Sequence, residues 1–357
     1  MIYRLKKIIL LSILISFYSV ALHGVEPTWE VNVGSVFDNR EGDANMNDAK
    51  TFFFVTLAPE IGLKLNSSDR ISGGAVWTQP LENGVRNGKI LPVLYYRRES
   101  DSWSFSMGMF PRTQLRAPLP GFMWNDSLAY FQRNIRGALV QYSHRKGYFD
   151  AYIDWRGMQS ETTREAFNIV FHGEIYPTGK PFLIGGNFMM NHLARRKESP
   201  EHEKVVDNFM ANPYVGVDYS RKTVLDSLVV KVGGVLSLER NRADLIGWRV
   251  PGGIWCDVLA ELKFIGFRNS LYVGGKLFPE YSLLGTTLYQ GESYYRSPFY
   301  NRTDIYARII KNKYVNLEAQ LNFNFAKNNF IFYQRLLLEV HVGNITGKMR
   351  RNGQYDR

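Results

Sequence analysis

Apolar and polar side chains alternate one by one over many short stretches of this chain. From Val315 to Phe325 every second residue is apolar, and the residues between them are Asn, Glu or Gln. The same alternation occurs over 103–109, 149–155 and 167–175. Successive side chains of a strand point to opposite faces, so each stretch predicts a strand with one apolar and one polar face. An amphipathic helix would instead repeat its apolar positions at intervals of three and four.

About sixteen such segments can be placed along the chain. They lie near 29–38, 51–65, 70–79, 90–99, 103–111, 135–145, 148–157, 166–176, 182–193, 209–220, 226–239, 254–264, 270–278, 302–311, 315–325 and 330–342. The connections alternate between short and long, except that the last one, 326–329, is short where a long one is due. Short turns at one end and longer loops at the other are typical of an outer-membrane barrel. The pattern therefore predicts an all-β fold: a single antiparallel transmembrane β-barrel of about 16 strands, with short periplasmic turns and longer extracellular loops.

The N-terminus has the order of a secretory signal peptide. Arg4, Lys6 and Lys7 precede an apolar run from Ile8 to about Leu22, which ends in small residues. The run is shorter than the ~20 residues that a membrane-spanning helix needs. We therefore predict a signal peptide at 1–24 cleaved near 21–24, a barrel at 25–342 and a polar tail at 343–357, with the mature protein in the outer membrane.

Composition narrows the function classes. Hydrophobic residues make up 45% of the chain and charged residues 22%, too apolar for disorder and too charged for a helical membrane bundle. A single cysteine, Cys256, excludes an internal disulfide and a cysteine-cluster metal site, and we predict no metal and no cofactor. The formal charge of +11 calls for an anionic partner. Export and the scattered basic residues argue against nucleic acid, so we expect outer-membrane lipid and lipopolysaccharide.

The signal peptide, the alternating strands, the alternating connections and a long third loop together resemble the porin-type barrels of Gram-negative outer membranes. In that family the third loop folds into the lumen and narrows it. The corresponding segment here is 112–134. The resemblance implies a pore constriction formed by Arg112, Arg116, Asp126 and Arg133. One departure concerns the C-terminus, because porins typically finish on an aromatic residue and here a polar tail follows Val342.

The predicted inner faces carry charges of both signs. Sixteen strands leave room for an aqueous channel, and charged side chains would hold water in it. The predicted lumen-lining residues are Asp150, Asp154, Lys231, Glu239, Asp257, Glu261, Lys263, Arg308, Glu318, Arg335 and Glu339. We predict a passive channel for small hydrophilic solutes, with a mild anion preference from the loop arginines. The alternative is that these charged side chains are simply solvated and give the channel no ion selectivity. The sequence leaves open whether the barrel forms a homo-oligomer.

Two other functions compete with a channel: a non-conducting barrel that serves as a scaffold or secretion-system component, and an outer-membrane enzyme. Nothing in the sequence excludes the scaffold. For an enzyme, Ser143 and His144 are adjacent in one strand and so point to opposite faces. No nucleophile elbow or zinc-protease helix motif occurs. His192 and His341, near strand ends, are interpreted as ordinary polar residues. We therefore predict no enzymatic activity and no catalytic residues.

Overall fold

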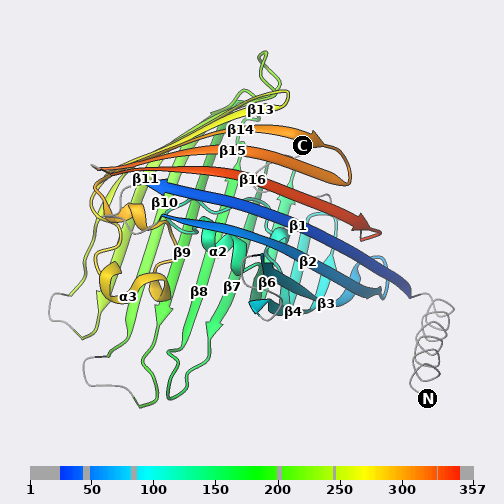
Figure 1. The fold of residues 1–357 in the computed structure, drawn as a ribbon, viewed down its shortest axis with the longest axis horizontal. Coiled ribbons are helices and arrows are strands. Elements are labelled where there is room, and N and C mark those ends of the chain that lie inside the picture. Colours follow the sequence, from blue (N-terminus) through cyan, green and yellow to red (C-terminus); the bar gives the residue numbers. More distant parts are fainter. Residues whose placement is uncertain are drawn as a thin grey trace.

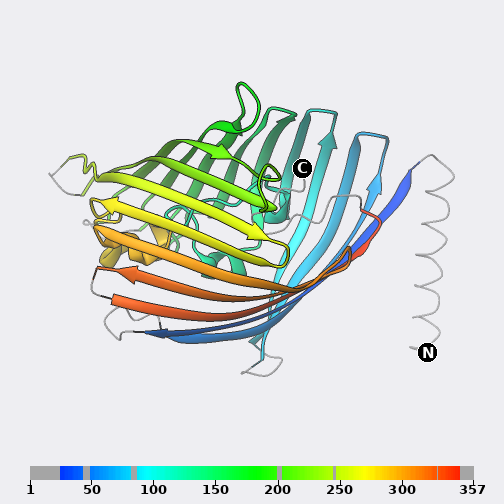
Figure 2. The same ribbon diagram turned by 90° about the horizontal axis from the view of Figure 1, so that it is seen from above.

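The computed structural model shows one ring of sixteen antiparallel strands that closes on itself. It describes residues 25–42, 49–81, 87–198, 203–243, 247–327 and 329–345. The predicted signal peptide and most of the predicted polar tail therefore lie outside the described residues. The strands curve around a central space, and Figures 1 and 2 show this ring from two directions.

Each strand pairs with its neighbours in the sequence, and the first also pairs with the last. The strands are β1 Glu26–Gly42, β2 Lys50–Lys64, β3 Asp69–Pro80, β4 Lys89–Glu99, β5 Trp103–Pro111, β6 Asn134–His144, β7 Gly147–Gly157, β8 Ala166–Ile175, β9 Phe182–Leu193, β10 Val206–Asp218, β11 Ser227–Asn241, β12 Gly252–Leu262, β13 Ile265–Gly274, β14 Phe299–Lys311, β15 Val315–Ala326 and β16 Asn329–Gly343. The predicted all-β closed barrel of about 16 strands is confirmed.

The connections sort by length between the two ends of the barrel. We call the end that holds the short connections, such as 65–68 and 263–264, the turn end, and the opposite end the loop end. The N-terminal end of β1 and the C-terminal end of β16 both lie at the turn end, where Glu30 pairs with Gly343. The strand predicted near 270–278 is placed too late in the chain: β13 begins at Ile265 and ends at Gly274, and Lys263 lies in the turn before it with a φ of 51°.

The alternation assigns the two faces of the wall as predicted. In β15 the apolar Leu321 and Phe325 are each 43% exposed on the outside, whereas Asn322 and Asn324 are buried on the inside. In β1 Phe37 is exposed and its neighbour Asp38 is buried. An apolar outer wall with polar groups inside is the arrangement that a lipid bilayer requires of a barrel. None of the helices in the described residues is long and apolar enough to cross a membrane.

Two long connections fold into the barrel, and we call them the in-folded loops. The first, 112–133, contains η3 Arg112–Gln114 and α2 Asp126–Phe131; the second, 275–298, contains α3 Tyr281–Leu288 and η4 Ser293–Arg296. Both views place α2 inside the ring of strands. The loops meet there: the Glu292 backbone N–H donates to the Gly121 carbonyl at 2.8 Å, and the Phe122 ring packs edge-on against Tyr295 at 5.6 Å.

Candidate functional site

The first in-folded loop crosses the barrel interior and is held on the far wall by ion pairs. Its residue Asp126 contacts Arg302 of β14 at 2.8 Å and Arg335 of β16 at 2.7 Å. Burial alone would raise the pKa of the Asp126 carboxyl, but the two arginines outweigh burial and hold that pKa well below its usual range. Asn125 caps α2 by accepting the Leu128 backbone N–H at 2.8 Å. The loop is therefore fixed at both sides of the lumen.

The three arginines predicted for the constriction all lie in or beside this loop, but their surroundings differ. Arg112 forms an ion pair with Asp154 of β7 at 2.5 Å and lies 3.9 Å from the Trp124 ring. The Arg116 backbone N–H donates to Asp150 at 2.6 Å. Arg133 donates to the Thr56 hydroxyl at 2.8 Å. In the part of the chain that the structure describes, Arg133 has no carboxylate within 4.0 Å.

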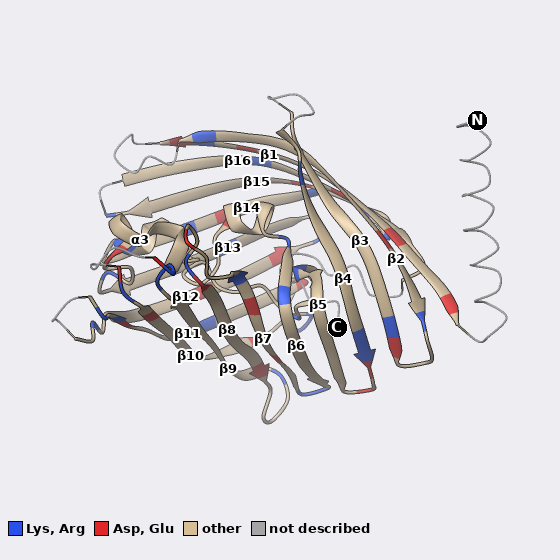
Figure 3. Ribbon diagram, turned by 90° about the horizontal axis from the view of Figure 1, so that it is seen from below, with Lys and Arg blue, Asp and Glu red and all other residues tan. Residues whose placement is uncertain are grey.

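Ten of the eleven predicted lumen residues point into the barrel, and most are paired. They are Asp150, Asp154, Lys231, Glu239, Asp257, Glu261, Arg308, Glu318, Arg335 and Glu339. Arg308 contacts both Glu261 and, at 3.4 Å, Glu318. Lys263 is the exception: it lies exposed in the turn between β12 and β13, because the strand ends one residue before it, and the prediction that it lines the lumen is wrong. Figure 3 shows basic and acidic segments interspersed along the strands.

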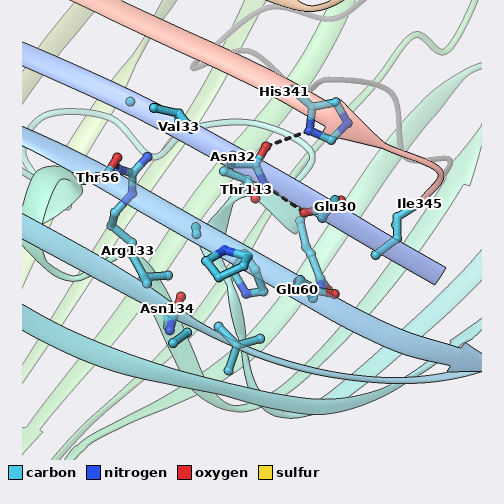
Figure 4. A pocket seen from close by; sticks show the side chains of 18 of the residues that line it. Glu30, Asn32, Val33, Thr56, Glu60, Thr113, Arg133, Asn134, His341 and Ile345 are labelled. Atoms are coloured by element: carbon cyan, nitrogen blue, oxygen red, sulfur yellow. Dashed lines mark hydrogen bonds between the residues drawn. The ribbon is translucent and has the colours of Figure 1, made fainter. Parts of the chain in front are cut away.

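A cavity of about 200 Å³ lies among β1–β4, β16 and the two ends of the first in-folded loop. We call it the turn-side cavity because its wall extends to Ile345, next to the turn end of β16. Figure 4 shows Arg133 and Thr56 on one side of this cavity and Glu30 and Glu60 on the other. His341, read from the sequence as an ordinary polar residue, also lines it and hydrogen-bonds Asn32 at 2.6 Å.

A second polar site lies on the outer wall, at positions where the alternation calls for apolar residues. On β9 the outward residues include Phe182 and Ile184, 60% and 50% exposed, and His192 falls in the same phase. On β10 Asp207 is likewise in phase with the outward Val215. His192 and Asp207 are register partners, and the His192 Nδ1 lies 2.8 Å from the Asp207 Oδ1.

The neighbours of this pair form one row across five strands. Trp155, Phe167, His192, Asp207 and Arg240 are successive register partners on β7 to β11. The Phe167 ring stacks on the His192 ring at 4.8 Å and on Trp155 at 5.5 Å. The row lies close to the loop end, because His192 is the last residue but one of β9 and Asp207 is the second residue of β10.

The surroundings of the outer-wall pair fix its chemistry. The second oxygen of Asp207 accepts from Arg242 at 2.8 Å, so the carboxylate is held on both sides. A carboxylate at Nδ1 favours the tautomer with hydrogen on that nitrogen, which leaves the His192 Nε2 as a base. The His192 side chain is 20% exposed. Among the described residues a second close histidine–aspartate pair, His172 with Asp150 at 3.4 Å, is fully buried inside the barrel.

Sequence reasoning gave His192 no role, although a signal was present. His192 and Asp207 both stand in the outward phase of an otherwise apolar alternation, each one residue from the loop-end terminus of its strand. Only the register of β9 on β10 shows that they are partners. Within the described residues, no group of three or more His, Cys, Asp or Glu side chains is arranged to hold a metal ion.

The fold of this chain is similar to the solved structures of porin-type barrels. Pseudomonas aeruginosa OpdK, solved with vanillate, is 11% identical with a TM-score of 0.52, and the match covers 89% of this chain and 99% of that one. P. aeruginosa OccK2 (OpdF), in complex with glucuronate, is 7% identical with a TM-score of 0.51, covering 89% and 98%. Pseudomonas putida OprB is 9% identical with a TM-score of 0.50, covering 91% and 96%. The predicted likeness to a porin-type outer-membrane barrel is confirmed for the fold.

No curated protein matches the chain. One family does: its description is lipid A 3'-O-deacylase-type, and it matches residues 28–343. The match begins in β1 and ends at the last residue of β16, so it spans the whole barrel. This description is that of an enzyme family, and it overturns the prediction that the chain is not an enzyme. The chain belongs to the lipid A 3'-O-deacylase-type family.

Proposed function

We propose that this barrel is an outer-membrane hydrolase that removes an ester-linked acyl chain from lipid A, with His192 as the general base. The observation that carries the proposal is a hydrogen-bonded histidine–aspartate pair on the apolar outer wall, next to the loop end. In a porin-type barrel the loop end faces the cell exterior, so this level meets the sugar and ester groups of the outer leaflet. The family description supplies the substrate class.

The proposed reaction is hydrolysis by an activated water. The His192 Nε2 takes a proton from water as its oxygen attacks the ester carbonyl, and Asp207 stabilises the imidazolium that forms. The bond between the acyl carbon and the sugar oxygen then breaks, and the imidazolium gives its proton to that leaving sugar oxygen. The products are a fatty acid and a free sugar hydroxyl. Stacking on Phe167 holds the imidazole ring in place for both proton transfers.

The outer wall around His192 matches the two parts of such a substrate. Phe171, Phe188 and Phe209 form an outward strip on β8, β9 and β10, with ring centroids 5.8 Å and 6.4 Å apart. Acyl chains would lie against this strip. Arg240, the register partner of Asp207, is exposed, and it supplies positive charge for the sugar phosphates. Export through residues 1–24, residence in the outer membrane and contact with lipopolysaccharide belong to this proposal.

The test is fatty-acid release from lipid A by the refolded barrel and two variants. We expect His192→Gln and Asp207→Asn to lower the rate by at least ~100-fold, the range typical for loss of a general base or its orienting group. His144→Gln is the matched control, since His144 ends β6 at the turn end, far along the wall from His192. Full activity in His192→Gln, or equal loss in His144→Gln, would overturn the proposal.

Passage of small hydrophilic solutes through the lumen is the second candidate function. The charged inner wall and the turn-side cavity support it. The mild anion preference, with Arg112, Arg116 and Arg133 as its source, remains part of this candidate. Liposome swelling by the His192→Gln variant separates the two functions: a channel still passes solutes when hydrolysis is lost, whereas a non-conducting scaffold passes none.

A further inference from the structure

We infer that the turn-side cavity binds a small zwitterion whose ammonium and carboxylate groups are several bonds apart, of the size of a dipeptide or an ω-amino acid. The inference does not rest on the proposed hydrolase, because the cavity is inside the barrel and His192 is outside. It rests on charged side chains of both signs that face the cavity without a close ionic partner. These are Glu30, Glu60, Arg70, Arg133 and Glu339.

The carboxylate side of the cavity is formed by β1 and β2. Glu30 and Glu60 are directly opposed register partners that both face inward. Glu30 accepts from the Asn32 amide at 2.9 Å, and Glu60 accepts from the Tyr95 hydroxyl at 2.5 Å. In the described residues neither has a cation within 4.0 Å. Like charges directly opposed on neighbouring strands destabilise a sheet, so this pair favours a bound cation.

Arg70 stands near both carboxylates but does not close an ion pair with either. Its Nη2 lies 3.3 Å from the Tyr95 hydroxyl, and its Nε is buried without a hydrogen-bond partner. Two carboxylates and one guanidinium leave net negative charge on this side. An ammonium group would neutralise it.

The opposite side of the cavity holds the cation Arg133, with Glu339 nearby, and an unused hydrogen-bond acceptor. Arg133 donates to Thr56 and has no carboxylate within 4.0 Å in the described part of the chain; Glu339 also lines the cavity, beyond that distance. Beside it, Asn134 is 8% exposed and its Oδ1 is buried without a partner, while its Nδ2 donates to the Pro92 carbonyl. A ligand carboxylate on Arg133 and a ligand N–H on Asn134 would satisfy both groups.

The spacing between the two sides sets the length of the ligand. Thr56, which marks the cationic side, and Glu60 are four residues apart on β2, or about 13 Å along the strand. A contact of about 3 Å at each end leaves roughly 7 Å between the charges of the ligand. Two residues of extended chain span about 7 Å, and a single amino acid spans half of that. The cavity volume of about 200 Å³ accommodates such a molecule.

Most other charged side chains in the described part of the lumen have a close ionic partner. Arg40 contacts Asp38 at 2.8 Å, and Arg302 contacts Asp304 at 2.8 Å, whereas Glu239 is hydrogen-bonded only to neutral groups. Charged side chains that face a cavity without a close ionic partner favour a ligand whose own charges complement them.

The test is calorimetric titration of the detergent-folded full chain with three probes that share a five-carbon chain: 5-aminopentanoate, pentanoate and pentylamine. We expect saturable binding of the zwitterion at least ~10-fold tighter than either singly charged probe. Arg133→Gln should weaken zwitterion binding at least ~10-fold, and so should Glu60→Gln, with Glu30→Gln as the second variant if Glu60→Gln does not fold. Gel migration before and after boiling reports folding.

Arg136→Gln and Glu41→Gln are the matched controls. Arg136 lies on β6 two residues from Asn134 but is exposed, and Glu41 is exposed at the loop end of β1. Both should leave binding unchanged. No saturable binding, equal affinity for all three probes, or equal weakening in Arg136→Gln would overturn the inference. Each result is independent of fatty-acid release from lipid A.

Discussion

Polar residues in this barrel matter most where they break the alternation of the wall. His192 and Asp207 occupy outward positions, and each is stabilised there by a neighbour: Phe167 stacks on His192, and Arg242 contacts Asp207. A charged group on a lipid-facing wall is costly unless it is paired and close to the membrane surface. Both conditions hold for this pair, which is why the fold tolerates it.

Inside the barrel, Glu292 makes the contact between the in-folded loops sensitive to pH. It accepts the Asp126 backbone N–H at 2.8 Å, and burial together with the nearby Asp126 charge raises the pKa of Glu292 to about 7. A carboxyl with a raised pKa in the folded state stabilises that state at low pH. This contribution is lost as the pH rises from the ordinary value of 4.5 toward 7.

We therefore expect the second in-folded loop to open more readily at pH 8 than at pH 5, by a free energy on the order of 2 kcal/mol. Hydrogen–deuterium exchange of 286–296, corrected for intrinsic rates, measures this opening. Glu292→Gln should remove the pH dependence. Glu203→Gln, in a different loop, should keep it, because there Arg196 lowers the pKa of Glu203 against the effect of burial. The same pH trend in Glu292→Gln would contradict the prediction.

At the scale of elements, alternation predicted where strands run but not what the loops do. The start of β13 was missed because Arg268 and Asn269 look like turn residues, yet Arg268 continues the inward polar phase of the strand. The resemblance to porins implied that 112–134 enters the lumen. It gave no sign that the second in-folded loop joins it, since that contact depends on Gly291 lying against Phe122, where a Cβ would come within 2.2 Å of the carbonyl oxygen.

The anchor of α2 gives a test of these loops. Asp126→Ala removes the carboxylate that Arg302 and Arg335 share, and so frees the first in-folded loop from the far wall. Arg302 keeps Asp304 as a partner and Arg335 keeps Asp38, so the barrel wall itself should stay intact. We expect single-channel conductance in planar bilayers to rise at least about twofold. Asp101→Ala, in a short exposed turn, is the control and should conduct like the wild type. Unchanged conductance in Asp126→Ala would show that this loop does not limit flow.

For the whole molecule, the closed ring with its apolar outer and polar inner face was predictable, and its membership in an enzyme family was not. Period-2 alternation and connection length are local properties, so both can be predicted from short stretches of the sequence. The His192–Asp207 pair depends on the register between two strands, and the turn-side cavity on residues from β1, β2 and the first in-folded loop. Such long-range contacts do not appear in spacing along one chain.

The preference of the lumen for anions over cations, a property of the whole barrel, remains a prediction. Arg112 is neutralised by Asp154, so Arg116 and Arg133 are left as the loop arginines that can attract anions, and Arg133 lines the turn-side cavity. We expect reversal potentials in a KCl gradient to show a mild preference for chloride, and Arg133→Gln to reduce it. A clear preference for potassium in the wild type would contradict this.

Under the proposed function, the outward direction of His192 also decides how the substrate reaches it. A base on the inner wall would draw molecules from the aqueous phase, whereas one on the outer wall meets lipids by two-dimensional diffusion within the leaflet. Turnover should then follow the surface density of the substrate in the vesicle rather than its bulk concentration. Dilution with inert phospholipid should slow the reaction, and adding water should not.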